Sequence, residues 1–215
     1  MKKNLLDMLL KLHPVSFELK KYNRKMQSAI DLNLETTESA IEVARTKWEE
    51  FKKKENSKYD NTFNVIIYSA LANSDMLILS TAIMTTNRKF EKLLFSRMLA
   101  LILIEYLSDI NSLLGKSFKE LKGGVFDESV NEIKVIGKKL AAIKNANESL
   151  LRVLRNETAA HKSKDSLDLV NQIYKIDCRS MCDLSVNVTN INNELFIAMG
   201  SVFILINQAE KNKQN

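Results

Sequence analysis

Glycine and proline are nearly missing from this chain of 215 residues, which holds 5 glycines and 1 proline. Proteins built from sheets change direction often, and their turns depend on these residue types. The scarcity therefore argues against a turn-rich β-fold and favours long helices joined by few loops. Aromatic residues are also few, at 7%, and they do not alternate with basic residues in the pattern that stacks nucleic-acid bases.

Cysteine and histidine are equally scarce, with 2 of each. Cys178 and Cys182 are four residues apart in a helical pattern, so they would lie on consecutive turns of one helix face. A disulfide there would constrain little, and we expect two reduced, partly buried thiols. His13 precedes Pro14 and has no carboxylate or thiol neighbour, which indicates a surface or loop residue. Without a Glu-x-x-His sequence for a di-metal bundle, we expect no metal and no cofactor.

The charge balance is mildly basic, with a net charge of +6 and a pI of about 9.2. This balance is compatible with nucleic-acid binding. The N-terminal residues 1–14 imitate a signal peptide, but Asp7 and Lys11 interrupt the apolar run and no small-residue cleavage site follows. No uninterrupted apolar run reaches the ~18 residues of a membrane span. We therefore expect a cytoplasmic protein that does not bind a membrane.

Apolar residues recur at spacings of three and four along most of the chain, the pattern of amphipathic helices. Thr36 or Thr37 is expected to cap one helix, and Asp60 or Asn61 the next. Polar residues 73–75 suggest a kink or a second start, with Asp75 as a cap or as the partner of a buried arginine. The expected helices span residues 17–34, 37–51, 61–84, 90–114, 127–161, 167–174 and 177–208.

These helices predict an all-α fold, an antiparallel bundle of long helices. Between Leu93 and Leu107 the chain is apolar on nearly every side, which places that helix at the centre of the bundle. Gly123 and Gly124 form the clearest break, and Asp127 is expected to cap the helix that follows. We assign residues 59–215 to the bundle and residues 1–58 to an N-terminal helical extension packed on it as one unit.

One helix carries a regular apolar seam that leads to a histidine. The spacing alternates between three and four residues over about three heptads. If the helix persists, the same register continues to His161, which would then face a neighbouring helix or a second subunit. The members of the seam are Ile133, Ile136, Leu140, Ile143, Asn147, Leu150 and Leu154.

The end of this seam holds the residues with the clearest chemistry. Arg155 offers a planar fork of donors for a phosphate, Asn156 can hydrogen-bond a substrate, and His161 can move a proton near neutral pH. Such residues can cleave RNA without a metal. On an unbroken helix, however, Arg155 and His161 would be about 240° apart. Either the helix breaks between them, or two copies of the segment form one site in a symmetric dimer, which supplies both an acid and a base.

Arg155-Asn156, four further residues and then His161 resemble the signature of the HEPN superfamily, and the wording Leu-Arg-Asn-x-x-Ala-Ala-His is most similar to HEPN proteins of the abortive-infection type. The resemblance implies a HEPN-like helical bundle that dimerises through residues 133–161. It also implies a metal-independent endoribonuclease of toxin–antitoxin or phage-defence systems, with Arg155, Asn156 and His161 as active-site residues. RNA and an antitoxin protein would be its partners.

Several interpretations stay open on the sequence alone. Lys162 and Lys164 either bind RNA phosphates or are ordinary surface lysines beside a helix end. The chain is either a HEPN-type ribonuclease or a non-catalytic HEPN-like module that binds RNA or a protein. In a third interpretation it is a structural bundle, in which Arg155 and Asn156 cap the helix and His161 fills a packing position.

Overall fold

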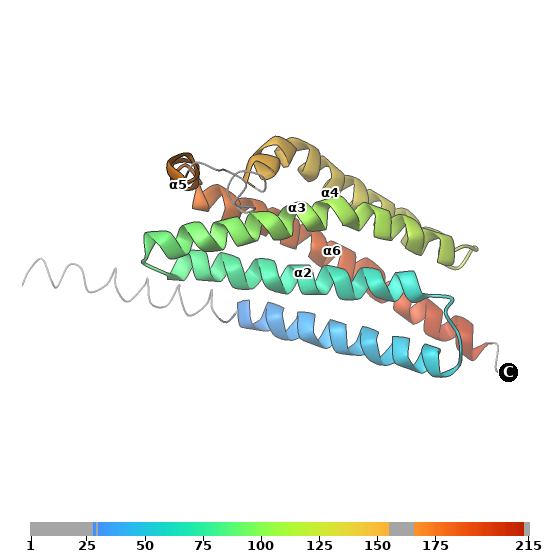
Figure 1. Cartoon of the computed structure of the whole chain (residues 1–215). Helices are drawn as coiled ribbons and strands as arrows, with labels where there is room; N and C mark the ends of the chain where they lie inside the picture. Colours follow the sequence, from blue (N-terminus) through green and yellow to red (C-terminus); the bar gives the residue numbers. More distant parts are fainter. Residues whose placement is uncertain (1–27, 29, 155–165, 213–215) are drawn as a thin grey trace, which may run out of the picture.

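The computed structural model describes residues 28, 30–154 and 166–212, and the regular structure in these ranges is helical throughout. A helix over residues 30–53 comes first, and a chain of further helices follows it (Figure 1). The prediction of an all-α helical bundle is confirmed. The further helices are α2 (Asp60–Thr85), α3 (Lys89–Glu120), α4 (Asp127–Val153), α5 (Ser166–Tyr174) and α6 (Cys178–Lys211).

α2 runs antiparallel to both of its neighbours α3 and α6. α2 and α3 form a long hairpin and lie side by side along their whole length, while α4 covers α3 and α6 packs against α2, α3 and α4 (Figure 1). Contacts between α2 and α6 fix their direction. The rings of Phe63 and Phe203 lie 5.3 Å apart near one end, and Ser80 donates a hydrogen bond of 2.9 Å to Ser185 towards the other.

α3 contacts α2, α4 and α6, which agrees with the central place that its apolar sequence predicted. Leu99, Leu103 and Leu107 on this helix are at most 1% exposed. One polar side chain lies among them: the hydroxyl of Tyr106 donates to Oδ1 of Asn192 on α6 over 2.5 Å. Burial raises the pKa of Tyr106, so this hydroxyl stays protonated and available as a donor.

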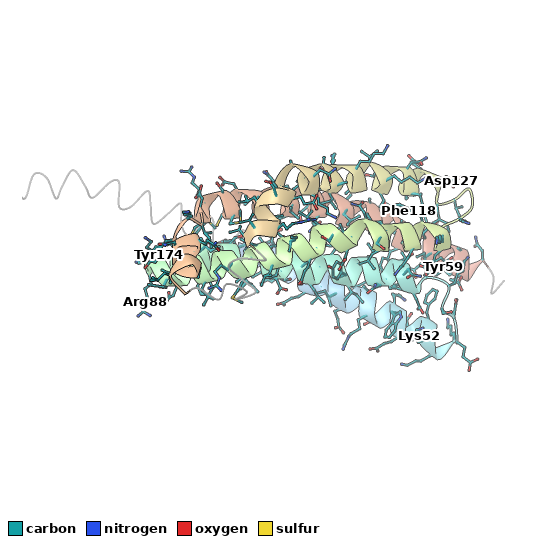
Figure 2. The ribbon with its side chains drawn as sticks, turned by 45° about the horizontal axis from the view of Figure 1, so that its top comes forward. Lys52, Tyr59, Arg88, Phe118, Asp127 and Tyr174 are labelled. Carbon is teal, nitrogen blue, oxygen red and sulfur yellow. The ribbon has the colours of Figure 1, made fainter. Side chains whose placement is uncertain are left out.

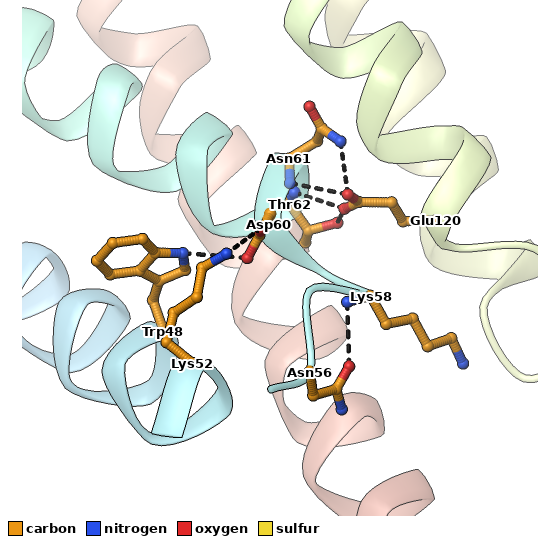
Figure 3. A network of polar contacts seen from close by, with 8 residues as sticks. All are labelled: Trp48, Lys52, Asn56, Lys58, Asp60, Asn61, Thr62 and Glu120. Carbon is orange, nitrogen blue, oxygen red and sulfur yellow. Dashed lines mark hydrogen bonds and ion pairs between the residues drawn. The ribbon is translucent and has the colours of Figure 1, made fainter. Parts of the chain in front are cut away.

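A carboxylate from α3 caps the N-terminus of α2. Oε1 of Glu120 accepts from the backbone N–H of Asn61 at 2.8 Å and from its side-chain amide at 2.6 Å. Oε2 accepts from the backbone N–H of Thr62 at 2.8 Å and from its hydroxyl at 2.9 Å (Figure 3). These contacts satisfy backbone donors that the first turn of a helix leaves without a partner. The prediction that Asp60 or Asn61 caps this helix is therefore wrong.

Asp60 instead ties the preceding helix to α2. Its carboxylate accepts from Nε1 of Trp48 at 3.1 Å and from Nζ of Lys52 at 2.6 Å (Figure 3). The ring of Phe51 adds an edge contact to Phe63, 5.5 Å between centroids. Residues 30–53 thus pack on the bundle. The division into an extension of residues 1–58 and a bundle of residues 59–215 stays a prediction.

The helix over residues 30–53 is continuous where a cap was expected. The hydroxyl of Thr36 donates to the carbonyl of Leu32, and that of Thr37 to the carbonyl of Asn33, both at 2.7 Å. Threonine makes such bonds inside a helix, to the residue four positions earlier. The prediction of a helix start at Thr36 or Thr37 is therefore wrong, because these hydroxyls bond backwards and not forwards.

α2 is also continuous through residues 73–75, so the expected kink or second start is absent from the described helix. Asn73 is fully buried, at 0% exposure, and belongs to the bundle core. Asp75 is exposed on the opposite side, which excludes a buried arginine as its partner. The break at Gly123 is confirmed, with a φ of 116° that favours glycine, but Asp127 lies inside the first turn of α4 and makes no cap bond.

Two helices have the length and composition of a membrane span. They are α2, with a mean hydropathy of 1.4, and α6, with 1.3, each taken over its most apolar stretch of 18 residues. In the bundle, 50% of that stretch in α2 and 39% in α6 are buried against the rest of the protein. Core helices of bundles share these properties. The cytoplasmic localisation therefore stays a prediction.

Candidate functional site at the end of α4

All of the site residues predicted from the sequence lie in the segment 155–165, outside the described residues. These residues are Arg155, Asn156, His161, Lys162 and Lys164. The structure describes both flanks of the segment, which are Leu154 at the end of α4 and Ser166 at the start of α5. The structure therefore describes the ends of the chain on either side of this segment, which are the last turns of α4 and the residues from Ser166 onwards.

The seam of α4 holds in its first half and shifts in its second. Ile133, Ile136 and Leu140 are buried as predicted. Further on, Leu154 is buried as predicted, at 6% exposure, whereas Leu150 is 44% exposed and Leu151, which the predicted seam did not include, is 1% exposed. Leu150 therefore does not face a neighbouring helix of the same chain, and its contact with a second subunit stays a prediction. A straight helix has 3.6 residues per turn and drifts away from a seven-residue repeat. Three turns after Leu140 the buried side of the helix therefore coincides with Leu151.

α4 bends near the middle of its second half. Its last turns angle back towards the other helices (Figure 1). Nδ2 of Asn147 donates to the carbonyl of Ile143, four residues earlier, over 2.9 Å. A side chain that bonds to a helix carbonyl in this way competes with the backbone ladder and often bends the helix. The one polar member of the predicted seam thus makes a bond of the kind that bends helices, within the half of α4 that bends.

A cavity of about 350 Å³ lies between α3 and the bent part of α4. Its α4 wall combines charged residues with a buried leucine, and its α3 wall is mostly aliphatic. Nη2 of Arg152 donates a hydrogen bond of 2.8 Å to Oε1 of Glu148. The lining residues are Ile104, Leu107 and Ser108 on α3, and Lys144, Glu148, Leu151 and Arg152 on α4.

Charge along α4 changes sign from its first turn to its last. Asp127 and Glu128 lie in the first turn, whereas Arg152 lies in the last and Lys144 precedes it on the cavity side. This order suits the helix dipole, which favours anions at the N-terminus and cations at the C-terminus. It also leaves positive charge beside the segment that begins at Arg155. The sequence interpretation missed this feature, although Lys144, Glu148 and Arg152 follow one another at four-residue spacing on a single face.

A second hollow, of about 460 Å³, lies on the other side of the last turns of α4. Leu150 and Val153 line it from α4, and Ile176 and Met181 line it from the start of α6 and the turn before it. The exposed fractions of Leu150 and Val153 are 44% and 48%, which are high for large apolar side chains. The end of α4 therefore presents apolar surface on one side and charged surface on the other.

The far flank of the segment is anchored on the start of α3. The ring of Tyr174, at the end of α5, makes an edge contact with Phe90, 5.8 Å between centroids. Nζ of Lys89 lies 4.3 Å from the centroid of the same ring. Figure 2 shows Tyr174 beside Arg88 at the end of the bundle opposite Lys52 and Tyr59. The segment 155–165 thus joins two elements that other helices hold in place.

The titratable groups elsewhere in the described ranges do not form a second candidate site. Burial, with the Asp109 and Glu105 carboxylates nearby, raises the pKa of Tyr68 to about 12. Glu105 and Asp109 are both exposed, and within the described residues no three His, Cys, Asp or Glu side chains gather as they would around a metal ion. Cys178 and Cys182 are free thiols, partly buried and buried respectively, which confirms the expectation for them.

Comparison with known proteins adds no relative. No protein-family model matches the chain, and neither a curated protein nor a solved structure matches it.

Proposed function

We propose that this protein is a metal-independent endoribonuclease of the HEPN type that acts in a toxin–antitoxin or phage-defence role. The observation that carries the proposal is the spacing of Arg155-Asn156 and His161 directly after a long helix of the bundle. The Arg155 and His161 side chains have the chemistry that cleavage through the 2′-hydroxyl requires. A protein antitoxin that silences the enzyme is part of the same proposal.

In the proposed reaction, the imidazole of His161 accepts the proton of a ribose 2′-hydroxyl. The 2′-oxygen then attacks the adjacent phosphorus, the bond to the 5′-oxygen of the next nucleotide breaks, and the products are a 2′,3′-cyclic phosphate and a 5′-hydroxyl. The guanidinium of Arg155 stabilises the negative charge that develops on the phosphate oxygens. The partner subunit's His161, in its protonated form, gives a proton to the departing 5′-oxygen.

The described residues support a site across a homodimer. Leu150 and Val153 expose apolar surface on the last turns of α4, next to the segment that would face the two-fold axis. Exposed apolar side chains that gather in this way favour association with another surface. On the other side of the same turns, Lys144 and Arg152 supply positive charge to hold a phosphate backbone. Lys162 and Lys164 would extend that charge towards the substrate.

Purified protein incubated with end-labelled single-stranded RNA in excess EDTA tests the proposal. The wild type should cleave, and His161→Ala should lower the rate by about 100-fold or more, as loss of general acid–base catalysis does. His13→Ala removes the only other histidine and serves as the matched control, with an expected wild-type rate. A wild-type preparation without cleavage, or equal rates for His161→Ala and wild type, would reject the enzyme.

The same experiment distinguishes the alternative, a non-catalytic HEPN-like module that binds RNA or a protein. In that case wild type and His161→Ala would retain RNA equally and neither would cut it. Mass measurement in solution tests the dimer separately. The proposal expects twice the chain mass of 24.6 kDa at micromolar concentration, and a monomer would remove the source of the second imidazole.

A further inference from the structure

The cavity between α3 and the bent part of α4 combines features that suit one class of ligand. Its floor is aliphatic, formed by Ile104, Leu107 and Leu151, and the last two of these are 1% exposed. Its rim carries the ammonium of Lys144 and the guanidinium of Arg152, together with the Glu148 carboxylate. The volume of about 350 Å³ lies within the range of small-molecule sites. A ligand with an apolar part for the floor and with polar and anionic groups for the rim fits this lining.

The two cations at the rim differ in whether they already form an ion pair. Arg152 is paired with Glu148 at 2.8 Å, and the two side chains are 66% and 44% exposed. Lys144 is half-buried and has no ion-pair partner among the residues that the structure describes. An ammonium that is not held in an ion pair can bind an incoming anion without giving up an existing contact. Lys144 is therefore the group that would hold a phosphate.

We propose that this cavity binds one nucleotide of an RNA strand, with its phosphate on Lys144 and Arg152 and its base on the aliphatic floor. Oε1 of Glu148 already accepts from Arg152 at 2.8 Å, so the other oxygen, Oε2, then faces the edge of the base and accepts hydrogen bonds from it. Guanine presents two adjacent N–H donors to a carboxylate, whereas uracil presents one N–H between two carbonyl oxygens that repel it. The pocket thus selects guanine over uracil, and it sets the sequence preference of the proposed ribonuclease.

The position of the cavity relates this pocket to the proposed cleavage site. Arg152 lies three residues before Arg155 in the sequence. The cavity therefore lies on the last described turns before the segment that carries the proposed catalytic residues. This inference rests on the proposed function for its biological role, but binding in the cavity can be measured without any cleavage.

The test uses the full-length protein with isotope-labelled leucine and isoleucine methyl groups, titrated with 5′-GMP, 5′-UMP, guanosine and inorganic phosphate. GMP should shift the methyl signals of Leu151 and Leu107, with UMP at least about fivefold weaker, the discrimination expected from one good base contact. Guanosine, which lacks the phosphate, should bind more weakly than GMP. Inorganic phosphate alone should bind more weakly still, because it leaves the aliphatic floor uncovered.

Variants locate the two contacts. Lys144→Ala should weaken GMP binding by about fivefold or more, through loss of a phosphate contact, and leave guanosine binding unchanged. Lys138→Ala removes an exposed lysine from another face of α4 and is the matched control, with GMP binding as in the wild type. Glu148→Gln should reduce the preference for GMP over UMP to less than about twofold, because the amide replaces an acceptor with a donor.

Several results would overturn the proposal. Equal binding of GMP by Lys144→Ala and Lys138→Ala would exclude the phosphate contact. Equal affinity for GMP and inorganic phosphate would leave an anion site and no nucleotide pocket. Shifts at Leu151 produced by a hexaglutamate peptide, with none from nucleotides, would assign the cavity to an acidic protein. RNA cleavage that depends on His161 while GMP leaves Leu151 unshifted would reject the pocket alone, and the reverse pattern would reject the enzyme alone.

Discussion

Two polar regions of the bundle differ in how completely their charges are paired. At the start of α2, both oxygens of Glu120 accept hydrogen bonds from Asn61 and Thr62, and four donors share one carboxylate. In the second half of α4, Lys144 lacks an ion-pair partner within the described residues, and the pair of Arg152 with Glu148 is exposed. The first region has no capacity left for a ligand, whereas the second has. Paired charges here serve the fold, and unpaired charges over a cavity mark where a ligand would bind.

The largest expected effect comes from breaking the paired region. Glu120→Ala removes the acceptor of two backbone N–H groups and two side chains at once, so we expect a loss of about 3 kcal/mol in the free energy of unfolding. Urea denaturation followed by circular dichroism measures it. Glu132→Ala, an exposed carboxylate on α4, is the control and should change stability by less than about 0.5 kcal/mol. Equal losses in both variants would contradict the assigned role of Glu120.

A second prediction concerns the start of α6, beneath the region that we assign to function. Burial raises the pKa of Cys182 to about 11, and the neighbouring Cys178 and Asp183 add to the rise. At pH 8 its thiolate fraction is then about 100-fold lower than that of a thiol with the ordinary value of about 9, so alkylation of Cys182 should be slower by at least that factor. Mass spectrometry of iodoacetamide-treated Cys178→Ser measures the rate, with glutathione as the reference.

The raised pKa of Cys182 also predicts how the stability of the folded protein changes with pH. The folded protein holds the proton of Cys182 more tightly than the unfolded chain does, because its pKa is raised on folding. The contribution is therefore fully present below about pH 9 and is lost as the pH rises towards 11. Cys182→Ser should flatten the decline over that range. An unchanged decline in this variant would show that another group causes it.

Much of this organisation was predictable from local sequence, and the failures have physical reasons. Apolar spacing predicted the central place of α3, and Gly123 marked the break after it, since both signals lie within the element concerned. The cap of α2 could not be predicted, because its acceptor, Glu120, lies 59 residues from Asn61 along the chain. For Thr36 the residue type suggested a cap, but a threonine hydroxyl also bonds backwards inside a helix.

In the candidate site, too, features within one segment could be predicted from the sequence, and features that join two helices could not. The motif residues Arg155 and His161 were found by spacing alone, yet they lie outside the described residues and their arrangement stays a prediction. The cavity was missed because half of its lining belongs to α3, which lies far from α4 residues 144–152 in the sequence. The four-residue spacing of Lys144, Glu148 and Arg152 was visible in the sequence, but the same spacing is common on solvated helix faces.

A third, smaller loss of stability is expected when the buried hydrogen bond between Tyr106 and Asn192 is removed. Tyr106→Phe removes the hydroxyl that donates to Asn192 and leaves a buried amide oxygen without its donor. We expect a loss of about 1–2 kcal/mol, the usual cost of an unmet buried hydrogen bond. Tyr174→Phe is the matched control, because Tyr174 is 42% exposed and solvent can replace any partner of its hydroxyl. If both variants unfold at the same denaturant concentration, the Tyr106 hydroxyl contributes nothing to stability.

The smallest effect is expected at a surface ion pair. Nζ of Lys139 lies 2.6 Å from Oε2 of Glu194, with side chains 47% and 48% exposed. Exposed pairs contribute about 0–1 kcal/mol, so Lys139→Ala should shift the unfolding midpoint only slightly, and less at high salt. Thermal unfolding at low and high salt measures this. A loss as large as that of Glu120→Ala would show that charge pairing on α4 also serves the fold.

The most direct test of the division between fold and function is the RNA cleavage rate of two variants in one EDTA-containing assay, at equal concentrations of folded protein. Glu120→Gln weakens the cap of α2 and should keep its rate within roughly threefold of the wild type, as a change remote from the chemistry does. His161→Ala should unfold like the wild type and lose about 100-fold or more of the rate. A large loss of rate in Glu120→Gln, or a wild-type rate in His161→Ala, would contradict the account.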